Sequence, residues 1–511
     1  MPSRFDLTEA DANIPLFGEL ARGLNEEQRA LLEHDLDRSP LLVLAGAGTG
    51  KTTSLTRRLA RECIEQGSSD ATLALTFTRK AAQEMRERAA HQLTSLGISL
   101  PSPWCGTFHS LGHRILQEPV AGKNGWQRLN RAIPRLLPPD EADHSRAQFW
   151  KDRFRQNTAR PWTSLELERL RCAWTTPEAL AASHPDHHGL ELWLAWNEWK
   201  ERQGIMDFED MIGLSIHLLQ TDGELAASWN ARARTLMVDE YQDTNRSQFR
   251  LVKALLGPSQ RLLAVGDDDQ SIYGFRGADI ENVLEFRRDF PNARLVKLER
   301  NYRSVQPVLD LANRVFPDKP VDYRKHLANG RASDGPRAQW WLARDEDEEL
   351  SWLFLETKKF LDLGISPSQI AVLVRTNRQI EPVRKTLAPL LPHAVNSPEG
   401  LQIFTVHASK GLEWEAVLLP FLDAPEKEGV RLLPAAQDEE RRLFYVAVTR
   451  ARDHLRLSCA SRRRKGDGWQ PSTPLPWFKL VRPGLSVLPG RLRRLGQILS
   501  KGRLRILETP C

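Results

Sequence analysis

Residues 41–53 read LLVLAGAGTGKTT, an apolar run that leads through a glycine-rich turn into Lys-Thr-Thr. The apolar run predicts a buried strand, and the residues after Gly50 predict a helix. In the turn, glycines let backbone N–H groups point inward around phosphates, Lys51 reaches the β and γ oxygens, and Thr52 can ligate Mg²⁺. The strict pattern has glycine where this chain has Ala45, but the glycines nearest Lys51 are kept. The stretch therefore predicts a phosphate-binding loop between a strand and a helix.

Short apolar runs, bounded by turn residues and followed by helical patterns, recur along the chain. The first series is LLVLAG at 41–46, TLALTFT at 72–78, TLMVDE at 235–240 and RLLAVGD at 261–267. The second series is ARLVKLE at 293–299, IAVLVRT at 370–376, LQIFTVH at 401–407 and HLRLSCA at 454–460. This alternation predicts an α/β protein with two parallel sheets, one for each series.

Between Arg114 and Asp207 the strand pattern disappears, and helical stretches rich in Trp, Pro, Arg and Glu take its place. This segment is predicted to be a helical insertion. Trp193, Trp196 and Trp199 share one helix face. A tryptophan stripe that meets DNA is one interpretation, and packing against the first domain is the favoured one.

The composition excludes several classes of protein. The 511 residues are 41% hydrophobic, with no apolar run near the roughly 18 residues of a membrane span and no secretory signal pattern at the start. The five cysteines are scattered without the paired spacing of a metal site or a disulfide framework. We therefore expect a cytoplasmic protein with no membrane partner.

The basic charge is concentrated at the carboxyl end. Ser461 to Cys511 contain twelve Lys or Arg and two acidic residues, so this end carries +10 and the rest of the chain −4. Such a tail can hold phosphates or an acidic partner, and a solvated end is the alternative interpretation.

An acidic pair ends the predicted strand TLMVDE. Asp239 would hold Mg²⁺ directly or through water, and Glu240 would orient and deprotonate the water that attacks the γ-phosphate. An ordinary acidic turn at the surface is the alternative, and the preceding phosphate loop favours the catalytic interpretation.

Phosphoryl transfer also needs cations on the developing charge, and Arg276, Arg303 and Arg450 follow predicted strands. Each of them can also be surface charge. Gln270, in VGDDDQSIYGFRGA, follows another strand end, where its amide can sense the γ-phosphate. The residues alone thus predict a nucleoside triphosphatase with two sheets.

The order of these motifs resembles the UvrD/Rep type of superfamily 1 DNA helicase, from Leu24 to about Ser458. The stretches that carry the resemblance are LNEEQRAL at 24–31, LTFTRKAAQEM at 75–85, GTFHSLGHRIL at 106–116, DFEDMI at 207–212, DEYQDTN at 239–245, VGDDDQSIYGFRGA at 265–278, ERNYRS at 299–304, TVHASKGLEW at 405–414 and EERRLFYVAVTRAR at 439–452. The resemblance implies two RecA-like domains.

The resemblance implies ATP and Mg²⁺ as cofactors and assigns most of the nucleotide contacts. Gln28 would read the adenine, Tyr302 would stack on it, and Arg303 and Arg450 would meet the γ-phosphate, with Glu413 also at the nucleotide. The phosphate loop would contribute Gly46, Ala47, Gly48, Thr49, Gly50, Lys51, Thr52 and Thr53, and the metal ligands would be Thr52 and Asp239. The catalytic set would be Lys51, Glu240, Gln270, Arg303 and Arg450. By this analogy the nucleotide site closes when ATP bridges the two domains, and hydrolysis opens it.

Contacts to DNA also follow from the resemblance. Stacking or support of bases would come from Phe77, Phe108, Tyr273 and Phe275, and contacts to the strand from Thr107, His109, Arg276, Thr405 and His407. Single residues have structural alternatives, because Phe108 can be core, His109 a capped histidine and His407 a satisfied polar residue. Arg79 stands where the family commonly has Asn, and Phe275 where it commonly has Trp.

One segment of the family is missing. Only 21 residues separate Gln379 from Leu401, where the usual member inserts a helical domain, called 2B, that touches duplex DNA. The expected domains are 1A at 1–115 and 205–285, the insertion 1B at 116–204, 2A at 286–485 and the basic tail at 486–511.

The activity implied is that of an ATP-dependent 3′→5′ DNA translocase and helicase, acting on single-stranded and tailed duplex DNA in repair, replication or phage defence. The alternative is an ATP-switched single-stranded-DNA-binding subunit that signals to or powers a partner, such as a nuclease or repair factor. An RNA remodelling enzyme is a third interpretation.

Overall fold

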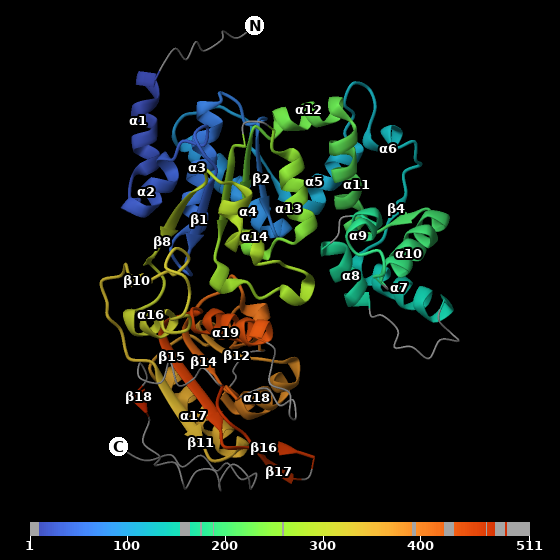
Figure 1. The fold of residues 1–511 in the computed structure, drawn as a ribbon. Coiled ribbons are helices and arrows are strands. Elements are labelled where there is room, and N and C mark those ends of the chain that lie inside the picture. The colour runs from blue at the N-terminus through green and yellow to red at the C-terminus, as the bar shows by residue number, and fades with distance from the viewer. Residues whose placement is uncertain are drawn as a thin grey trace, which may run out of the picture. The chain divides into compact units, whose positions relative to one another are not determined.

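The computed structural model describes residues 10–153, 164–173, 176–187, 189–257, 260–390, 395–423, 434–466, 468–475 and 486–487. The chain forms two compact units, drawn in Figure 1. The first unit runs up to Ala45 and from Gly50 to Leu298, and the second comprises Gly46–Thr49 and the chain from Glu299 onward. Each unit is described by itself.

A six-stranded parallel sheet forms the centre of the first unit, in the order β3-β2-β6-β7-β1-β8. Its strands are β1 (Leu41–Ala45), β2 (Thr72–Thr76), β3 (Trp104–Thr107), β6 (Thr235–Val238), β7 (Leu262–Gly266) and β8 (Arg294–Leu298). The four strands β1, β2, β6 and β7 are buried along their whole length, which is the pattern of a parallel sheet covered on both faces.

The helices of the first unit join these strands. They are α1 (Ala10–Ala21), α2 (Glu26–Glu33), α3 (Lys51–Glu65), α4 (Arg79–Ser95), α5 (Phe108–Gln117), α6 (Gly125–Arg128), α11 (Phe208–Thr221), α12 (Gly223–Arg232), α13 (Arg246–Leu255), α14 (Glu281–Leu284) and α15 (Phe286–Asp289). Several begin at a side-chain cap. Asn25, for example, accepts a hydrogen bond from the N–H of Gln28 at 2.8 Å, while its own N–H donates to the Gln28 side chain at 3.1 Å.

The insertion forms a helical cluster at the side of the first unit (Figure 1). It contains α7 (Pro139–Arg153), α8 (Ser164–Ala173), α9 (Pro177–Ser183) and α10 (Gly189–Gln203), with the short strands β4 (Arg135–Leu136) and β5 (Ile205–Met206). Trp193 and Trp196 are buried, and the Trp196 and Trp199 rings stack with centroids 5.1 Å apart. The rings are therefore packed rather than arranged as an exposed stripe, but the predicted partner is wrong, because they pack in a core of the insertion itself that includes Phe149 and Leu167.

A second six-stranded parallel sheet forms the centre of the second unit, in the order β13-β12-β14-β15-β11-β18. Its strands are β11 (Gln339–Ala343), β12 (Ile370–Val374), β13 (Gln402–Thr405), β14 (Trp414–Leu419), β15 (Ala451–Ala460) and β18 (Ser486–Val487). The helices are α16 (Gln306–Asn313), α17 (Glu346–Asp362), α18 (Ile380–Leu387) and α19 (Pro434–Val448). Two strand pairs lie outside the sheet, β9 (Arg300–Asn301) with β10 (Ala328–Asn329), and β16 (Arg462–Lys465) with β17 (Gly468–Pro471).

The prediction of two parallel α/β sheets is confirmed. The assignment of ARLVKLE at 293–299 to the second sheet is wrong, because this run forms β8 and pairs with β1, placing Val296 opposite Val43. Of the strands in the two large sheets, β3, β11, β14 and β18 were not predicted. A local pattern identifies a strand, whereas its partner depends on packing between distant segments.

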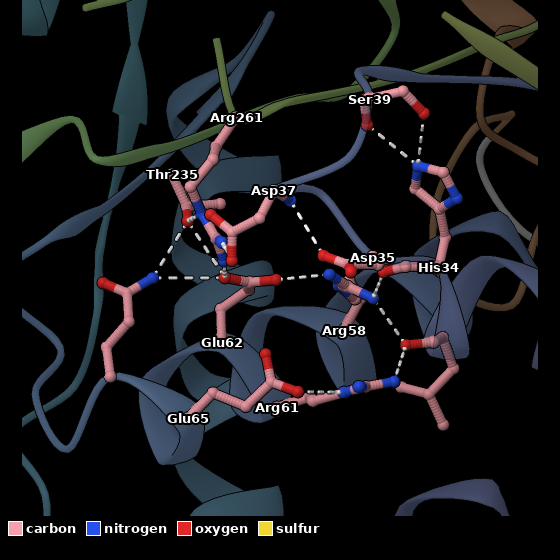
Figure 2. Close-up of polar contacts among 12 residues, drawn as sticks. His34, Asp35, Asp37, Ser39, Arg58, Arg61, Glu62, Glu65, Thr235 and Arg261 are labelled. Atoms are coloured by element: carbon pink, nitrogen blue, oxygen red, sulfur yellow. Dashed lines mark hydrogen bonds and ion pairs between the residues drawn. The ribbon is translucent and has the colours of Figure 1, made fainter. Parts of the chain in front are cut away.

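Buried ionic groups fix helix α3, which follows the phosphate loop, to the amino ends of two strands (Figure 2). Arg58 donates to two backbone carbonyls of the segment 32–34, each at 2.6 Å. Glu62 has no exposed surface and accepts hydrogen bonds from Arg261 at 2.6 Å and from Thr235 at 2.9 Å. Thr235 opens β6 and Arg261 immediately precedes β7. The helix that presents Lys51 is therefore anchored at its far end.

Candidate nucleotide site and nucleic-acid interface

The phosphate loop has the backbone that its glycines predict. Gly48 and Gly50 adopt φ values of +68° and +80°, in the left-handed region that favours glycine. Thr49 Oγ1 donates to the Gly46 carbonyl at 2.8 Å, which closes the turn. Helix α3 then begins at Lys51, so its first N–H groups lie next to the loop, where an anion is favoured.

Lys51 and Glu240 approach each other at the carboxyl ends of the first sheet. The Lys51 Nζ lies 3.7 Å from Glu240 Oε1, with both side chains partly exposed. Glu240 has a φ of +51°, and a left-handed conformation at a residue other than glycine often marks a functional position. The geometry keeps a carboxylate beside the cation that the phosphate loop supplies.

Asp239 is the buried member of the acidic pair. Burial raises the pKa of Asp239 to about 7, and Glu240 adds to this rise while Lys51 opposes it. Its Oδ1 is buried and accepts no hydrogen bond among the described residues. An orphaned carboxylate oxygen suits a hard cation such as Mg²⁺, which prefers oxygen ligands. Thr52, the second predicted metal ligand, is half-buried in the first turn of α3.

A chain of hydrogen bonds leads from Glu240 to the loop after β7. The Gln242 Nε2 donates to Glu240 at 2.5 Å, and Gln242 Oε1 accepts from the N–H of Asp267 at 2.8 Å. The Gln270 Nε2 then donates to Asp267 Oδ2 at 2.6 Å. Gln270 was predicted from the sequence, but Gln242 and Asp267 were missed. Their only local signal is a polar side chain just after a strand end.

Gln28 is nearly buried, at 4% exposure. Its side-chain oxygen takes part in the cap of α2. A Cβ added to Gly50 would lie 2.7 Å from Gln28 Nε2. The side chain predicted to read adenine is thus held close to the phosphate loop, and Gly50 leaves it room.

Aromatic rings line up beside the β2 and β7 ends. Phe77 and Tyr273 stack with centroids 5.4 Å apart and planes at 10°, and Phe275 lies 6.1 Å from Tyr273. The Arg276 guanidinium lies 5.5 Å from both the Tyr273 and the Phe275 ring centroids. All four side chains are at least partly exposed. We call Phe77, Tyr273, Phe275 and Arg276 the stacking ladder.

The predicted contacts at the start of α5 have different surroundings. Phe108 is only 3% exposed, so it belongs to the core and can support bases only through other residues. Thr107 caps α5 by accepting from the N–H of Ser110 at 3.2 Å. His109 packs edge-on against Phe208 at 5.2 Å, with Nε2 3.7 Å from a Glu209 oxygen.

The second unit holds the remaining residues that were predicted to contact the nucleotide. Arg303 Nε pairs with Glu413 Oε2 at 2.5 Å, and Tyr302 is 42% exposed. Arg450 is 1% exposed and donates to the carbonyls of Val446 and Leu412, both at 3.0 Å. The predicted γ-phosphate arginines are therefore already held by protein groups, Arg303 by a carboxylate and Arg450 by carbonyls.

In the same unit, the end of β9 contacts the phosphate loop through the side chain of Asn301 and the backbone of Tyr302. Asn301 Nδ2 donates to the Ala47 carbonyl at 2.5 Å, and the N–H of Tyr302 donates to the Gly48 carbonyl at 2.9 Å. Asn301 has no exposed surface and was not predicted as a site residue, although it lies in ERNYRS.

The residues of the second unit that were predicted to contact the DNA strand lie at the end of β13 and just after it. Thr405 ends this strand, and its hydroxyl accepts from the N–H of Ala408 at 3.3 Å. His407 begins the short helix that follows and is half-buried. The structure thus places these two side chains near each other at the carboxyl end of one strand.

The fold and these sites define a phosphate-loop protein with two parallel α/β sheets. The chain belongs to the UvrD/REP helicase family, because the model of the UvrD/REP helicase N-terminal domain matches residues 24–291 and that of the UvrD-like helicase C-terminal domain matches residues 296–395 and 383–462. The resemblance in the motifs is thereby confirmed.

Similar proteins include the ATP-dependent DNA helicase PcrA of Staphylococcus epidermidis, 34% identical over 372 residues, and that of Staphylococcus aureus, 32% identical over the same length. These alignments cover 72% of this chain and 50% of each relative, so the chain spans about half the length of the curated relatives it matches.

A solved structure of the C-terminal domain of a possible DNA helicase from Lactobacillus plantarum WCFS1 covers 36% of this chain and 98% of that chain. It has 16% identity and a TM-score of 0.26, too little similarity to bear on the fold. Among the helices that the structure describes, none has the length and apolar character to cross a membrane.

Proposed function

We propose that the chain is an ATP-dependent motor that moves 3′→5′ on single-stranded DNA and separates duplex DNA. The observation that carries this proposal is the hydrogen-bonded chain from Glu240 through Gln242 and Asp267 to Gln270. Gln270 lies three residues before Tyr273 of the stacking ladder. A change at the γ-phosphate can therefore reach the side chains suited to stack on bases. Stacking is tolerant of sequence, as a translocating enzyme requires.

The chemistry we propose is hydrolysis of the γ-phosphoryl bond. Lys51 holds the γ-phosphate, and Glu240 orients a water molecule and takes its proton as the oxygen attacks phosphorus. The bond to the β-phosphate oxygen breaks, leaving ADP and inorganic phosphate. Mg²⁺, when bound, neutralises charge on the phosphates, and Asp239 and Thr52 are the residues that would hold it.

The domains assigned from the sequence remain part of this proposal, with 1A and 2A as the two RecA-like domains and 116–204 as 1B. The 3′→5′ polarity is proposed from the resemblance of the motif set, and the relatives named above are DNA helicases by name.

Strand displacement tests the proposal directly. The purified chain is incubated with duplexes that carry a 3′ or a 5′ single-stranded tail, and ATP hydrolysis is followed in parallel with and without DNA or RNA strands. We expect stimulation by single-stranded DNA and displacement from the 3′ tail, both abolished in Lys51→Ala. Displacement from the 5′ tail alone, or stimulation by RNA but not DNA, would contradict it.

A second candidate is an ATP-switched clamp on single-stranded DNA that signals to or powers a protein partner. The short segment of 21 residues between Gln379 and Leu401 favours it, because the resemblance implies at this place an inserted domain that touches duplex DNA. In the same assay, this candidate predicts DNA-stimulated hydrolysis without displacement from either tail.

A further inference from the structure

Helix α8 of the insertion contacts the loop that carries two members of the stacking ladder. Arg169 Nε donates to the backbone carbonyl of Phe275 at 3.1 Å. Beside this bond, Gly277 passes directly over Cys172, because a Cβ at Gly277 would lie 2.9 Å from the Cys172 Cβ and 3.2 Å from its Sγ. Gly277 also has a φ of +86°. The loop therefore contacts α8 at two points, through the hydrogen bond from Arg169 and through the close packing of Gly277 on Cys172.

Helix α8 is itself held firmly by the first sheet's helices. Arg171 is 4% exposed and makes two hydrogen bonds to Asp207 of the turn before α11, at 2.6 and 2.8 Å. Lys200 of α10 donates to Asp210 at 2.5 Å in the same buried group. At the carboxyl end of α8, Ser247 Oγ donates to the carbonyls of Arg171 and Cys172 at 2.9 and 3.1 Å. The helix is therefore joined by hydrogen bonds to the start of α11 and to α13.

The carbonyl that Arg169 holds belongs to the peptide between Phe275 and Arg276. The orientation of this peptide fixes where both side chains leave the backbone, and the Arg276 guanidinium lies 5.5 Å from both aromatic centroids. If this peptide could rotate, the side chains of Phe275 and Arg276 would be less well fixed, whereas Phe77 and Tyr273 would keep their own stack.

We propose that Arg169 is a positioning residue, through which α8 of the helical insertion sets the stacking ladder for single-stranded DNA. The inference rests on the proposed function, since it assigns the insertion a part in the grip on DNA. Arg169 is exposed and touches no residue of the nucleotide site among those described. Its loss should therefore weaken the binding of single-stranded DNA and leave ATP hydrolysis without DNA intact.

The test compares Arg169→Ala, Arg169→Lys and wild type in DNA-stimulated ATP hydrolysis. The matched control is Arg202→Ala, another exposed arginine of the insertion, which pairs only with Glu198 of its own helix among the described residues. A second readout is the fluorescence of a 2-aminopurine base in an oligothymidine strand, which falls when the base stacks. Ser247→Ala provides an independent way to loosen α8.

We expect Arg169→Ala to raise the half-saturating DNA concentration about three- to tenfold, the effect of losing one hydrogen bond. It should also weaken the fluorescence quench and leave hydrolysis without DNA within about twofold of wild type. Arg169→Lys should recover part of both effects, because an ammonium can donate to the carbonyl. Ser247→Ala should shift both readouts in the same direction.

Equal DNA dependence and quench in Arg169→Ala and Arg202→Ala would overturn the inference. Parallel loss of hydrolysis without DNA would also overturn it, because Arg169 would then support the fold as a whole. A wild-type chain whose hydrolysis DNA does not stimulate would instead refute the proposed function, so the two failures are distinguishable.

Discussion

Glu240 combines three unusual properties in one side chain. Its backbone is left-handed, its carboxylate lies 3.7 Å from Lys51, and it accepts a hydrogen bond from Gln242. A left-handed conformation at this residue costs free energy that the surrounding structure must supply. The carboxylate of the residue so placed lies within reach of the lysine.

We predict that Glu240→Gln retains ATP binding but lowers the turnover number about 10²- to 10⁴-fold, because an amide cannot accept the proton of the attacking water. Binding of a fluorescent ATP analogue and steady-state hydrolysis measure the two effects separately. Glu84→Gln, an exposed acid on α4 paired with Arg88, is the matched control. Near-normal turnover in Glu240→Gln would remove Glu240 from the role of base.

For single residues, the sequence predicted candidate site residues wherever a reaction needs several residue types close together in one short motif. The phosphate loop, the acidic pair and Gln270 were all predicted from local spacing. Gln242 and Asn301 were missed, because their contacts are with residues 25 and 254 positions away. Phe108 is the opposite case, a residue predicted to contact DNA that is buried in the core. Its motif suggests a contact to the DNA strand, whereas its burial depends on elements that no local pattern describes.

Among the elements, α3 has the most demanding placement, because it must present Lys51 at one end and pack against the sheet along its length. The pKa of Glu62 near its other end lies below the usual range, because Arg58 and Arg261 outweigh the burial that opposes ionisation. The ionised carboxylate of Glu62 thus has two guanidinium partners, which Figure 2 shows. Its buried charge is fully compensated only when both Arg58 and Arg261 are present.

We predict that Arg261→Met destabilises the first unit by about 3 kcal/mol, because it removes one partner of a carboxylate that stays buried. Chemical denaturation followed by circular dichroism measures the change. Arg88→Met, which breaks an exposed pair on α4, should cost less than about 1 kcal/mol. Equal effects of the two substitutions would show that the buried cluster contributes no more than a surface pair.

Strand order was the feature of the elements least accessible from the sequence. The run that forms β8 resembles the strands of both sheets in composition, and it stands directly before ERNYRS at 299–304, which belongs to the second unit. Its place beside β1 depends on burying Val296 and Leu298 against the core of the first unit. Parallel strands pair across long stretches of chain, so local alternation predicts that a strand exists but not its neighbour.

For the whole molecule, the proposed function requires that the chain hold DNA long enough to act, and only 21 residues separate Gln379 from Leu401, where the resemblance implies an inserted domain that touches duplex DNA. The basic tail at 486–511 is a candidate for such a contact, because its residues 488–511, which follow β18, contain six Lys or Arg and one acid. We predict that removing residues 488–511 weakens binding to single-stranded DNA and flattens its dependence on salt. The slope of log affinity against log salt should fall by about 0.7 for each phosphate that the protein no longer neutralises. Fluorescence anisotropy at several salt concentrations measures this slope, and a variant with the six basic residues replaced by glutamine separates charge from length. An unchanged slope in both variants would leave the tail as a solvated end and place the whole grip on the two α/β units.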